Sequence, residues 1–166
     1  MTPLLHSVLS ALQDASIPTE IRENESLFPW VESLHVLAIC TVVGTISIVD
    51  LRLLGFASRE RPVLELSNNL LVCTWIAFAV AAITGSLLFS AKALTYAGNF
   101  YFQVKLVLLA LAGLNMAAFH LMSGRRIGEW GAGSIPPLPA RVAGGLSLLI
   151  WVGVVGFGRW IGFTIH

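Results

Sequence analysis

Charged side chains are scarce in this sequence of 166 residues, and neither sign is in excess. Asp, Glu, Lys and Arg make up 11% of the chain, whereas a soluble domain has about 25%. Ten Lys and Arg residues stand against nine Asp and Glu residues, so there is no basic surplus for the phosphates of a nucleic acid. The composition therefore excludes a water-soluble enzyme, a disordered regulator and a nucleic-acid-binding protein.

Cysteine is also rare. Cys40 and Cys73 both fall inside apolar runs, where we expect them to be small buried hydrophobic residues. Neither belongs to a CxxC or CxxCH motif, which argues against covalently attached haem.

Apolar residues are abundant: they form 56% of the chain, and the mean hydropathy is +0.81. A helix needs about 20 apolar residues to cross a bilayer. Four runs reach that length, at residues 29–49, 69–89, 100–122 and 142–164. We therefore predict an all-α integral membrane protein, with one four-helix bundle over residues 28–166 in contact with the lipid bilayer.

Residues 1–27 precede the first of these spans. Leu5, Val8, Leu9 and Leu12 have the spacing of a short amphipathic helix that lies on the membrane surface. Residues 16–26 are polar and acidic, and we expect them to form a loop.

Basic residues predict the orientation. They cluster after the first span and after the third, at Arg52, Arg59, Arg61, Arg125, Arg126 and Arg141. Short loops rich in Lys and Arg stay in the cytoplasm. We therefore expect a bacterial inner-membrane protein with both termini, and hence the N-terminal helix and acidic loop, in the periplasm.

Ionisable residues inside spans are costly and usually face the interior of the bundle. His35 lies about 9 Å into the first span, with Glu32 one turn before it, while Lys105 and Arg159 lie about 8 Å from the outer ends of the third and fourth spans. We predict that these four residues and Tyr101 form an outer polar cluster that binds an anionic or carbonyl-bearing ligand. Alternatively, Glu32 pairs with Arg159 while the Lys105 side chain extends to the membrane surface.

A stripe of residues on one face of the third span ends at His120. Its members follow steps of three and four and should point inward; they are Tyr101, Lys105, Leu109, Ala112, Met116 and His120. His35 and His120 are both candidate metal ligands, but they should lie about 20 Å apart along the membrane normal. One haem between them is therefore disfavoured, and a haem on His35 would be five-coordinate or take His6 or His166 as its second ligand.

Several segments resemble known bacterial families. HVLAICTVVG (residues 35–44), the Thr84-Gly85 pair and the spacing of Lys105 and Asn115 are similar to four-helix membrane domains like copper-resistance protein D. ESLHVLAI (residues 32–39) and DLRLLG (residues 50–55) more closely resemble a bacterial inner-membrane family catalogued only as a domain of unknown function. The resemblance implies a four-helix fold whose relatives include copper-import components and b-type cytochrome subunits. The chain lacks the Met-rich or Cys-rich tracts that would favour copper.

Three hypotheses for function follow. The first is a subunit that binds haem b and passes electrons between quinone and a periplasmic partner, with Lys105 and Arg159 paired to the haem propionates. The second is a copper-handling or small-solute transport module that uses His35, Met116 and His120. The third is a non-catalytic membrane subunit or anchor whose polar residues only lock the bundle. Separately, the glycine-rich fourth span could serve packing within the bundle or mediate a homo-oligomer.

Overall fold

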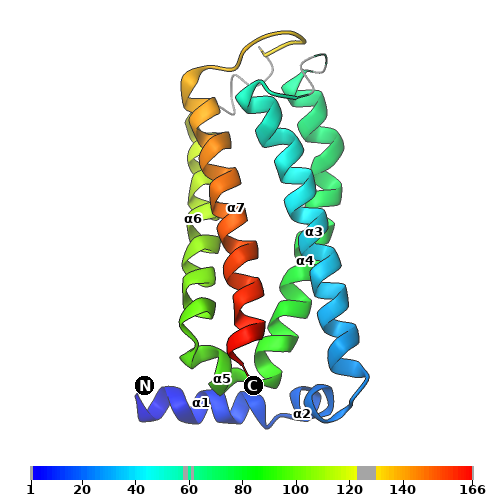
Figure 1. Ribbon diagram of the computed structural model, residues 1–166, viewed down its shortest axis with the longest axis vertical. Helices are drawn as coiled ribbons and strands as arrows, with labels where there is room; N and C mark the ends of the chain where they lie inside the picture. Colours follow the sequence, from blue (N-terminus) through cyan, green and yellow to red (C-terminus); the bar gives the residue numbers. More distant parts are fainter. Residues whose placement is uncertain (1, 58–59, 61, 123–129, 166) are drawn as a thin grey trace.

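Four long helices make up most of the molecule (Figure 1). The computed structural model describes residues 2–57, 60, 62–122 and 130–165, and within them all regular secondary structure is helical. The long helices are α3 (Leu27–Leu54), α4 (Val63–Ala91), α6 (Phe100–Met122) and α7 (Leu138–Thr164). Each is long and apolar enough to cross a membrane. The chain is thus a multi-pass membrane protein, and the predicted all-α four-helix bundle is confirmed.

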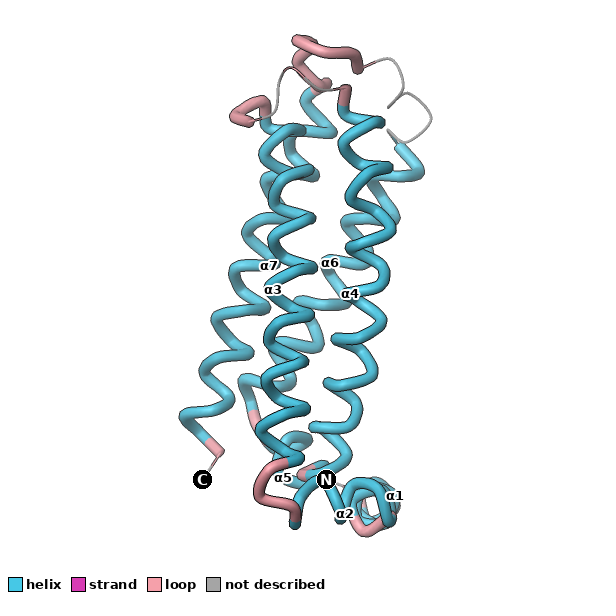
Figure 2. The backbone as a smooth tube through the Cα atoms, turned by 90° about the vertical axis from the view of Figure 1, so that its right-hand side faces the viewer, coloured by secondary structure: helices cyan, strands magenta, loops and turns pink. Residues whose placement is uncertain are grey.

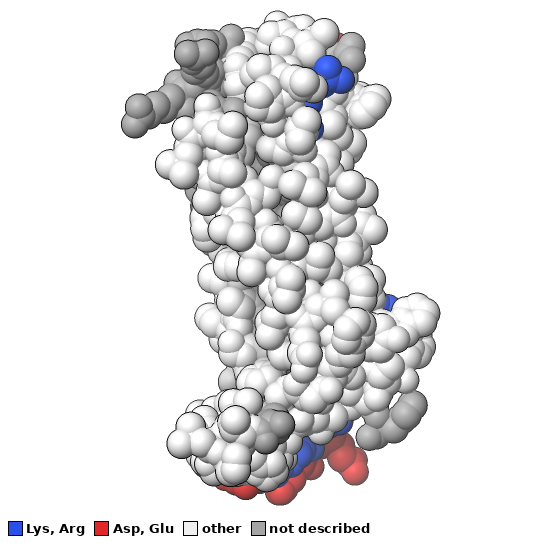
Figure 3. Space-filling model, turned by 90° about the vertical axis from the view of Figure 1, so that its left-hand side faces the viewer, with Lys and Arg blue, Asp and Glu red and all other residues white. Residues whose placement is uncertain are grey.

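The outer surface of these helices is suited to lipid. Large apolar side chains are exposed on all four, among them Leu37, Val72, Ile76, Val107, Leu114, Leu149 and Val152. On the face drawn in Figure 3, charged side chains gather at the two ends and leave a broad band between them nearly free of charge. Such a band would be unfavourable in water but matches the hydrocarbon core of a bilayer.

The four helices pack in pairs. Helix α3 lies against α4, α6 lies against α7, and α3 joins the two pairs by packing on α7. The main core cluster forms where three of the helices meet, from Val42, Ala77, Ile150, Trp151 and Val154. Within the described residues, α4 and α6 make no close backbone approach. The backbones of these two helices are thus separated (Figures 1 and 2), and near the terminal end the stacked rings of Phe89 and Phe102, with centroids 5.3 Å apart, bridge them.

The end of the bundle that holds both chain termini, here called the terminal end, is covered by three short helices. These are α1 (Pro3–Gln13), α2 (Ser16–Glu23) and α5 (Ala93–Gly98). Arg22 of α2 links α1 to α4, because its guanidinium donates to the carbonyl oxygens of Gln13 (3.3 Å) and Ala91 (3.4 Å). The prediction of a surface helix near the N-terminus is confirmed. The prediction of a loop over residues 16–26 is wrong for residues 16–23, which form α2: Pro18 and Ile21 bury one face of this helix while its acidic residues remain at the surface.

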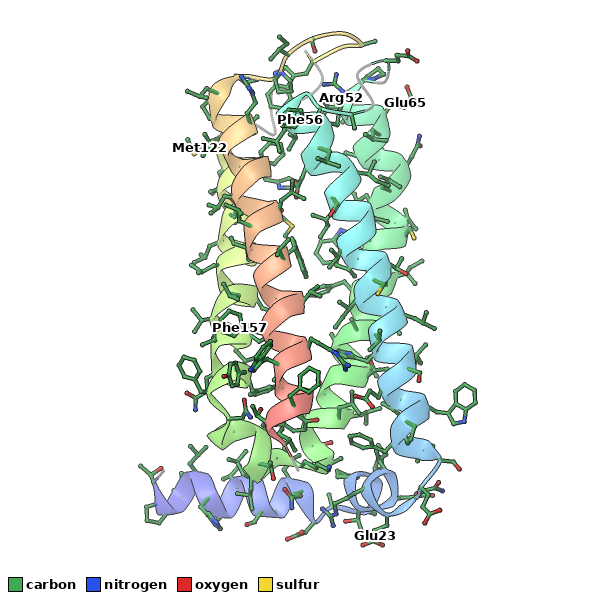
Figure 4. All side chains as sticks on the ribbon, viewed as in Figure 1. Glu23, Arg52, Phe56, Glu65, Met122 and Phe157 are labelled. Atoms are coloured by element: carbon green, nitrogen blue, oxygen red, sulfur yellow. The ribbon has the colours of Figure 1, made fainter. Side chains whose placement is uncertain are left out.

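At the opposite end, here called the loop end, the helices run further than hydropathy predicts. Helix α3 continues to Leu54 and stops at Gly55, whose φ of 82° is a left-handed conformation that glycine adopts without strain. Arg52, predicted in a loop, is fully buried in the last turn of α3 and donates to the carbonyl oxygens of Gly131 (3.2 Å) and Ser134 (3.3 Å). Figure 4 shows Arg52 at this end, close to the chain that crosses above it.

The other loop arginines divide into two groups. Arg141 lies in the first turns of α7 and is exposed. The remaining four, Arg59, Arg61, Arg125 and Arg126, lie outside the described residues.

Candidate functional site

His35 lies about 12 Å along α3 from the terminal end, on the side that contacts α4. Its Nδ1 is 2.9 Å from Oγ1 of Thr84. The ring also lies directly against Gly85, where an added Cβ would come within 2.8 Å of the imidazole Cε1. A residue without a side chain is therefore needed at position 85 to leave room for the imidazole.

The hydrogen bonds of Thr84 indicate which nitrogen of His35 carries the proton. The Thr84 hydroxyl lies 2.7 Å from the Val80 carbonyl oxygen, to which it donates its single hydrogen. It must therefore accept from His35, which places a proton on Nδ1. The Ala81 backbone also lies within hydrogen-bonding range of the His35 ring. With the proton on Nδ1, the lone pair of Nε2 is the one that a ligand could use.

Lys105 approaches this histidine from α6. Its side chain passes over Gly158 of α7, where an added Cβ would lie 3.8 Å from the Lys105 Cδ, Cε and Nζ atoms. The ammonium is close enough to His35 to act on the imidazole electrostatically. No carboxylate of the described chain is found to stabilise the Lys105 charge. The structure thus brings a histidine and an uncompensated cation together inside the bundle.

Arg159 does not face the interior of the bundle, although the sequence predicts that it belongs to the same polar cluster. It lies at a similar depth on α7, but it is exposed, and its guanidinium carbon lies 4.9 Å from the centre of the Phe163 ring. The reason is helical geometry: neighbouring residues point about 100° apart, so Gly158 faces Lys105 while Arg159 turns outward. Its role in binding a cofactor stays a prediction.

Tyr101 and Glu32 lie at the edges of the site. Tyr101 is half-buried among aromatic rings of α7, with centroids at 6.1 Å (Phe157) and 6.3 Å (Trp160). Glu32 is exposed one turn before His35. Its carboxylate acts on Tyr96 in α5: burial raises the pKa of Tyr96, and the Glu32 charge raises it further.

His120 lies two residues before the loop end of α6, whereas His35 lies eight residues from the terminal end of α3. His120 is exposed, and its Nδ1 donates to the Met116 carbonyl oxygen at 2.9 Å. The described residues include no group of three or more His, Cys, Asp or Glu side chains that could hold a metal ion.

Both cysteines are exposed, against the prediction that they are buried. In a bilayer the outside of the bundle is apolar as well, so a hydrophobic sequence environment does not indicate burial.

A second polar region surrounds a cavity of about 320 Å³ among the four long helices, nearer the loop end. Four members of the α6 stripe line it, as an inward-facing stripe predicts: Leu109, Ala112, Met116 and His120. The side chains that could bond to a ligand there are Thr45, Asp50, Ser67, Thr74, Asn115, His120 and Ser147. We call this space the loop-end cavity.

Asp50 is the residue of this cavity that sequence reasoning missed. Only 6% of its surface is exposed, and its Oδ2 has no hydrogen-bond partner in the described structure. The hydropathy pattern ended the first span at residue 49, which placed Asp50 in a loop. The signal that could have found it is the apolar pair Leu53 and Leu54 beyond it, because they continue the helix past the carboxylate.

Comparison with known proteins identifies a family. A model of a family of unknown function (DUF6644) matches residues 27–164, which span all four long helices. The chain belongs to this family. No curated protein and no solved structure matches it. The resemblance to a family of unknown function is thus confirmed, while nothing in the comparisons supports the resemblance to copper-resistance protein D or to b-type cytochromes.

Proposed function

We propose that this DUF6644 chain is a membrane subunit that binds haem b through His35 and passes electrons between quinone and a periplasmic partner. The observation in favour is the hydrogen bond of the imidazole: the Thr84 hydroxyl accepts a hydrogen bond from the Nδ1–H group, which leaves the lone pair on Nε2 for a ligand. Ligating histidines are held by such a hydrogen bond at the other nitrogen.

Two features near His35 bear on haem binding: a nearby cation and the absence of a second histidine at the same depth among the described residues. Lys105 supplies a cation that could pair with a propionate. The described residues offer no second histidine at this depth, so His35 is the residue of this part of the chain that would hold the group. When bound, haem would supply one-electron chemistry. The chain itself would hold the imidazole, neutralise the propionate and exclude water.

We also propose that the protein lies in a bacterial inner membrane, with its terminal end on the periplasmic side. The arginines of the loop-end connections support this orientation. His35 would then lie nearer the periplasmic surface, where a soluble redox partner could approach.

A visible absorption spectrum of the purified protein tests the proposal. We expect a Soret band that sharpens on reduction, that is lost in His35→Ala and is kept in His120→Ala. Lys105→Met should weaken haem retention without removing the band. A colourless protein, or a spectrum that His35→Ala leaves unchanged, would rule out haem at this site.

The second candidate, a small-solute transport module, is favoured by a different observation, the loop-end cavity. Copper handling is the variant of this hypothesis that uses His35, Met116 and His120. A colourless protein that retains copper would support it.

A further inference from the structure

We propose that the loop-end cavity is a binding site for a lipophilic ammonium compound, with Asp50 as the acceptor of its charged head. This inference is independent of a cofactor at His35, because His35 does not line the cavity.

The charge of the site comes from Asp50. An isolated carboxylate is costly to bury unless it is paired, and an ionisable residue inside a span is a candidate for function. Ser147 of α7 lies close enough to Asp50 to interact with its carboxylate, but Oδ2 has no hydrogen-bond partner in the described structure. The described cation nearest in sequence, Arg52, donates to the carbonyl oxygens of Gly131 and Ser134. The free oxygen can therefore accept a hydrogen bond from an incoming ammonium group.

The cavity is polar at one end and apolar at the other. Asp50 lies about 6 Å from the loop end of α3, whereas Val42 lies about 12 Å deeper. The deep part is lined by aromatic rings, including Trp75, Phe78 and Trp151. A ligand with a cationic head and an apolar or aromatic body matches this arrangement, because the deep rings would pack against the body while the head lies at Asp50.

The entrance lies between α4 and α6, whose backbones make no close approach and whose stacked rings, Phe89 and Phe102, lie at the terminal end, away from the cavity. Cavity-lining side chains on both are exposed: Leu71, Trp75 and Phe78 on α4, and Met116 and His120 on α6. A lipophilic molecule could therefore enter sideways from the bilayer. The volume, about 320 Å³, is at the small end of the range for ligand pockets, about 300–1,000 Å³.

The test uses two probes of the same shape. One is 2-phenylethylamine, which carries a positive charge at neutral pH, and the other is propylbenzene, its uncharged isostere. Binding is measured by equilibrium dialysis against the full chain in phospholipid nanodiscs, with empty nanodiscs subtracted to remove partition into lipid. We expect saturable binding of the amine to the wild-type protein.

Two variants test separately the role of the Asp50 charge and the role of the cavity volume. Asp50→Asn keeps the shape of the side chain and should weaken amine binding about ten- to hundredfold, while propylbenzene binds as before. Gly113→Leu should abolish binding of both probes, because Gly113 lines the cavity and an added Cβ there meets no atom within 4 Å. That variant therefore fills the space without a clash at its first carbon.

Controls keep the outcomes distinct. Asp14→Asn, at an exposed carboxylate of the terminal end, should bind both probes like the wild-type protein. If Asp50→Asn fails to fold, Ser147→Ala, which retains the charge, should weaken amine binding a few-fold and leave propylbenzene binding unchanged. Amine binding that is unaffected by Asp50→Asn, or that Gly113→Leu leaves intact, would overturn the proposal. His35→Ala should leave amine binding unchanged, so this proposal and the haem proposal fail separately.

Discussion

The contact between His35 and Gly85 joins α3 to α4 through one imidazole ring. An alanine at position 85 would place its Cβ 2.8 Å from the imidazole Cε1. A shift of the ring would strain its 2.9 Å hydrogen bond to Thr84. We predict that Gly85→Ala lowers the free energy of unfolding by about 1–3 kcal/mol, as overpacking typically does.

Thermal unfolding in detergent, followed by circular dichroism, would measure this loss. The control is the double variant His35→Ala/Gly85→Ala, in which the ring is absent. If Gly85→Ala costs as much there as in the wild-type protein, the contact with His35 is not the cause.

Tyr96 gives a second prediction, at alkaline pH. Because burial and the Glu32 charge raise the pKa of Tyr96, the folded state keeps the phenol proton at a pH where the unfolded chain releases it. The contribution to stability is therefore complete below about pH 10, the ordinary pKa of tyrosine, and is lost as the pH rises through the folded value. We expect the free energy of unfolding to fall less steeply above pH 10 in Tyr96→Phe than in the wild-type protein. The difference between the two should be constant from pH 7 to pH 9, and a difference that changes there would contradict this assignment.

Among the elements, the crossing of α3 and α7 depends on Gly144. An added Cβ would lie 3.1 Å from both the Asp50 carbonyl oxygen and the Leu53 Cβ, and neither atom belongs to a flexible side-chain end. We predict that Gly144→Ala lowers the free energy of unfolding by about 1–3 kcal/mol. Gly156→Ala is the matched control on the same helix, since its Cβ would meet nothing within 4 Å. Denaturant or thermal unfolding of both should show a loss for Gly144→Ala alone, and equal effects would argue against a tight crossing.

At the scale of the whole molecule, the charges at the two ends of the bundle predict its orientation in the membrane. Acidic side chains gather at the terminal end (Figure 3), while Arg52 in the last turn of α3 and Arg141 in the first turn of α7 lie at the loop end. We predict that a reporter fused after Ala97 is active in the periplasm and that one fused after Gly133 is active in the cytoplasm. Fusions with the opposite activities would invert the proposed orientation, although the contacts among the helices would be unaffected.

Hydropathy was sufficient to predict the class and the four spans, because crossing a bilayer requires a long apolar run whatever the packing. The predicted third span, residues 100–122, agrees with α6. Position along a helix also follows from counting, so the similar depths of His35 and Lys105 and the separation of His35 from His120 were predictable.

The direction in which each side chain points was decided by the tertiary structure. Only the packing of α6 on α7 brings Lys105 over Gly158 and turns Arg159 outward. Only the meeting of α3 and α7 buries Asp50 beside Ser147 and encloses the loop-end cavity. The physical reason is that hydropathy measures how readily a segment enters lipid, whereas a site depends on which helix faces which, and that is set by contacts between residues far apart in the chain.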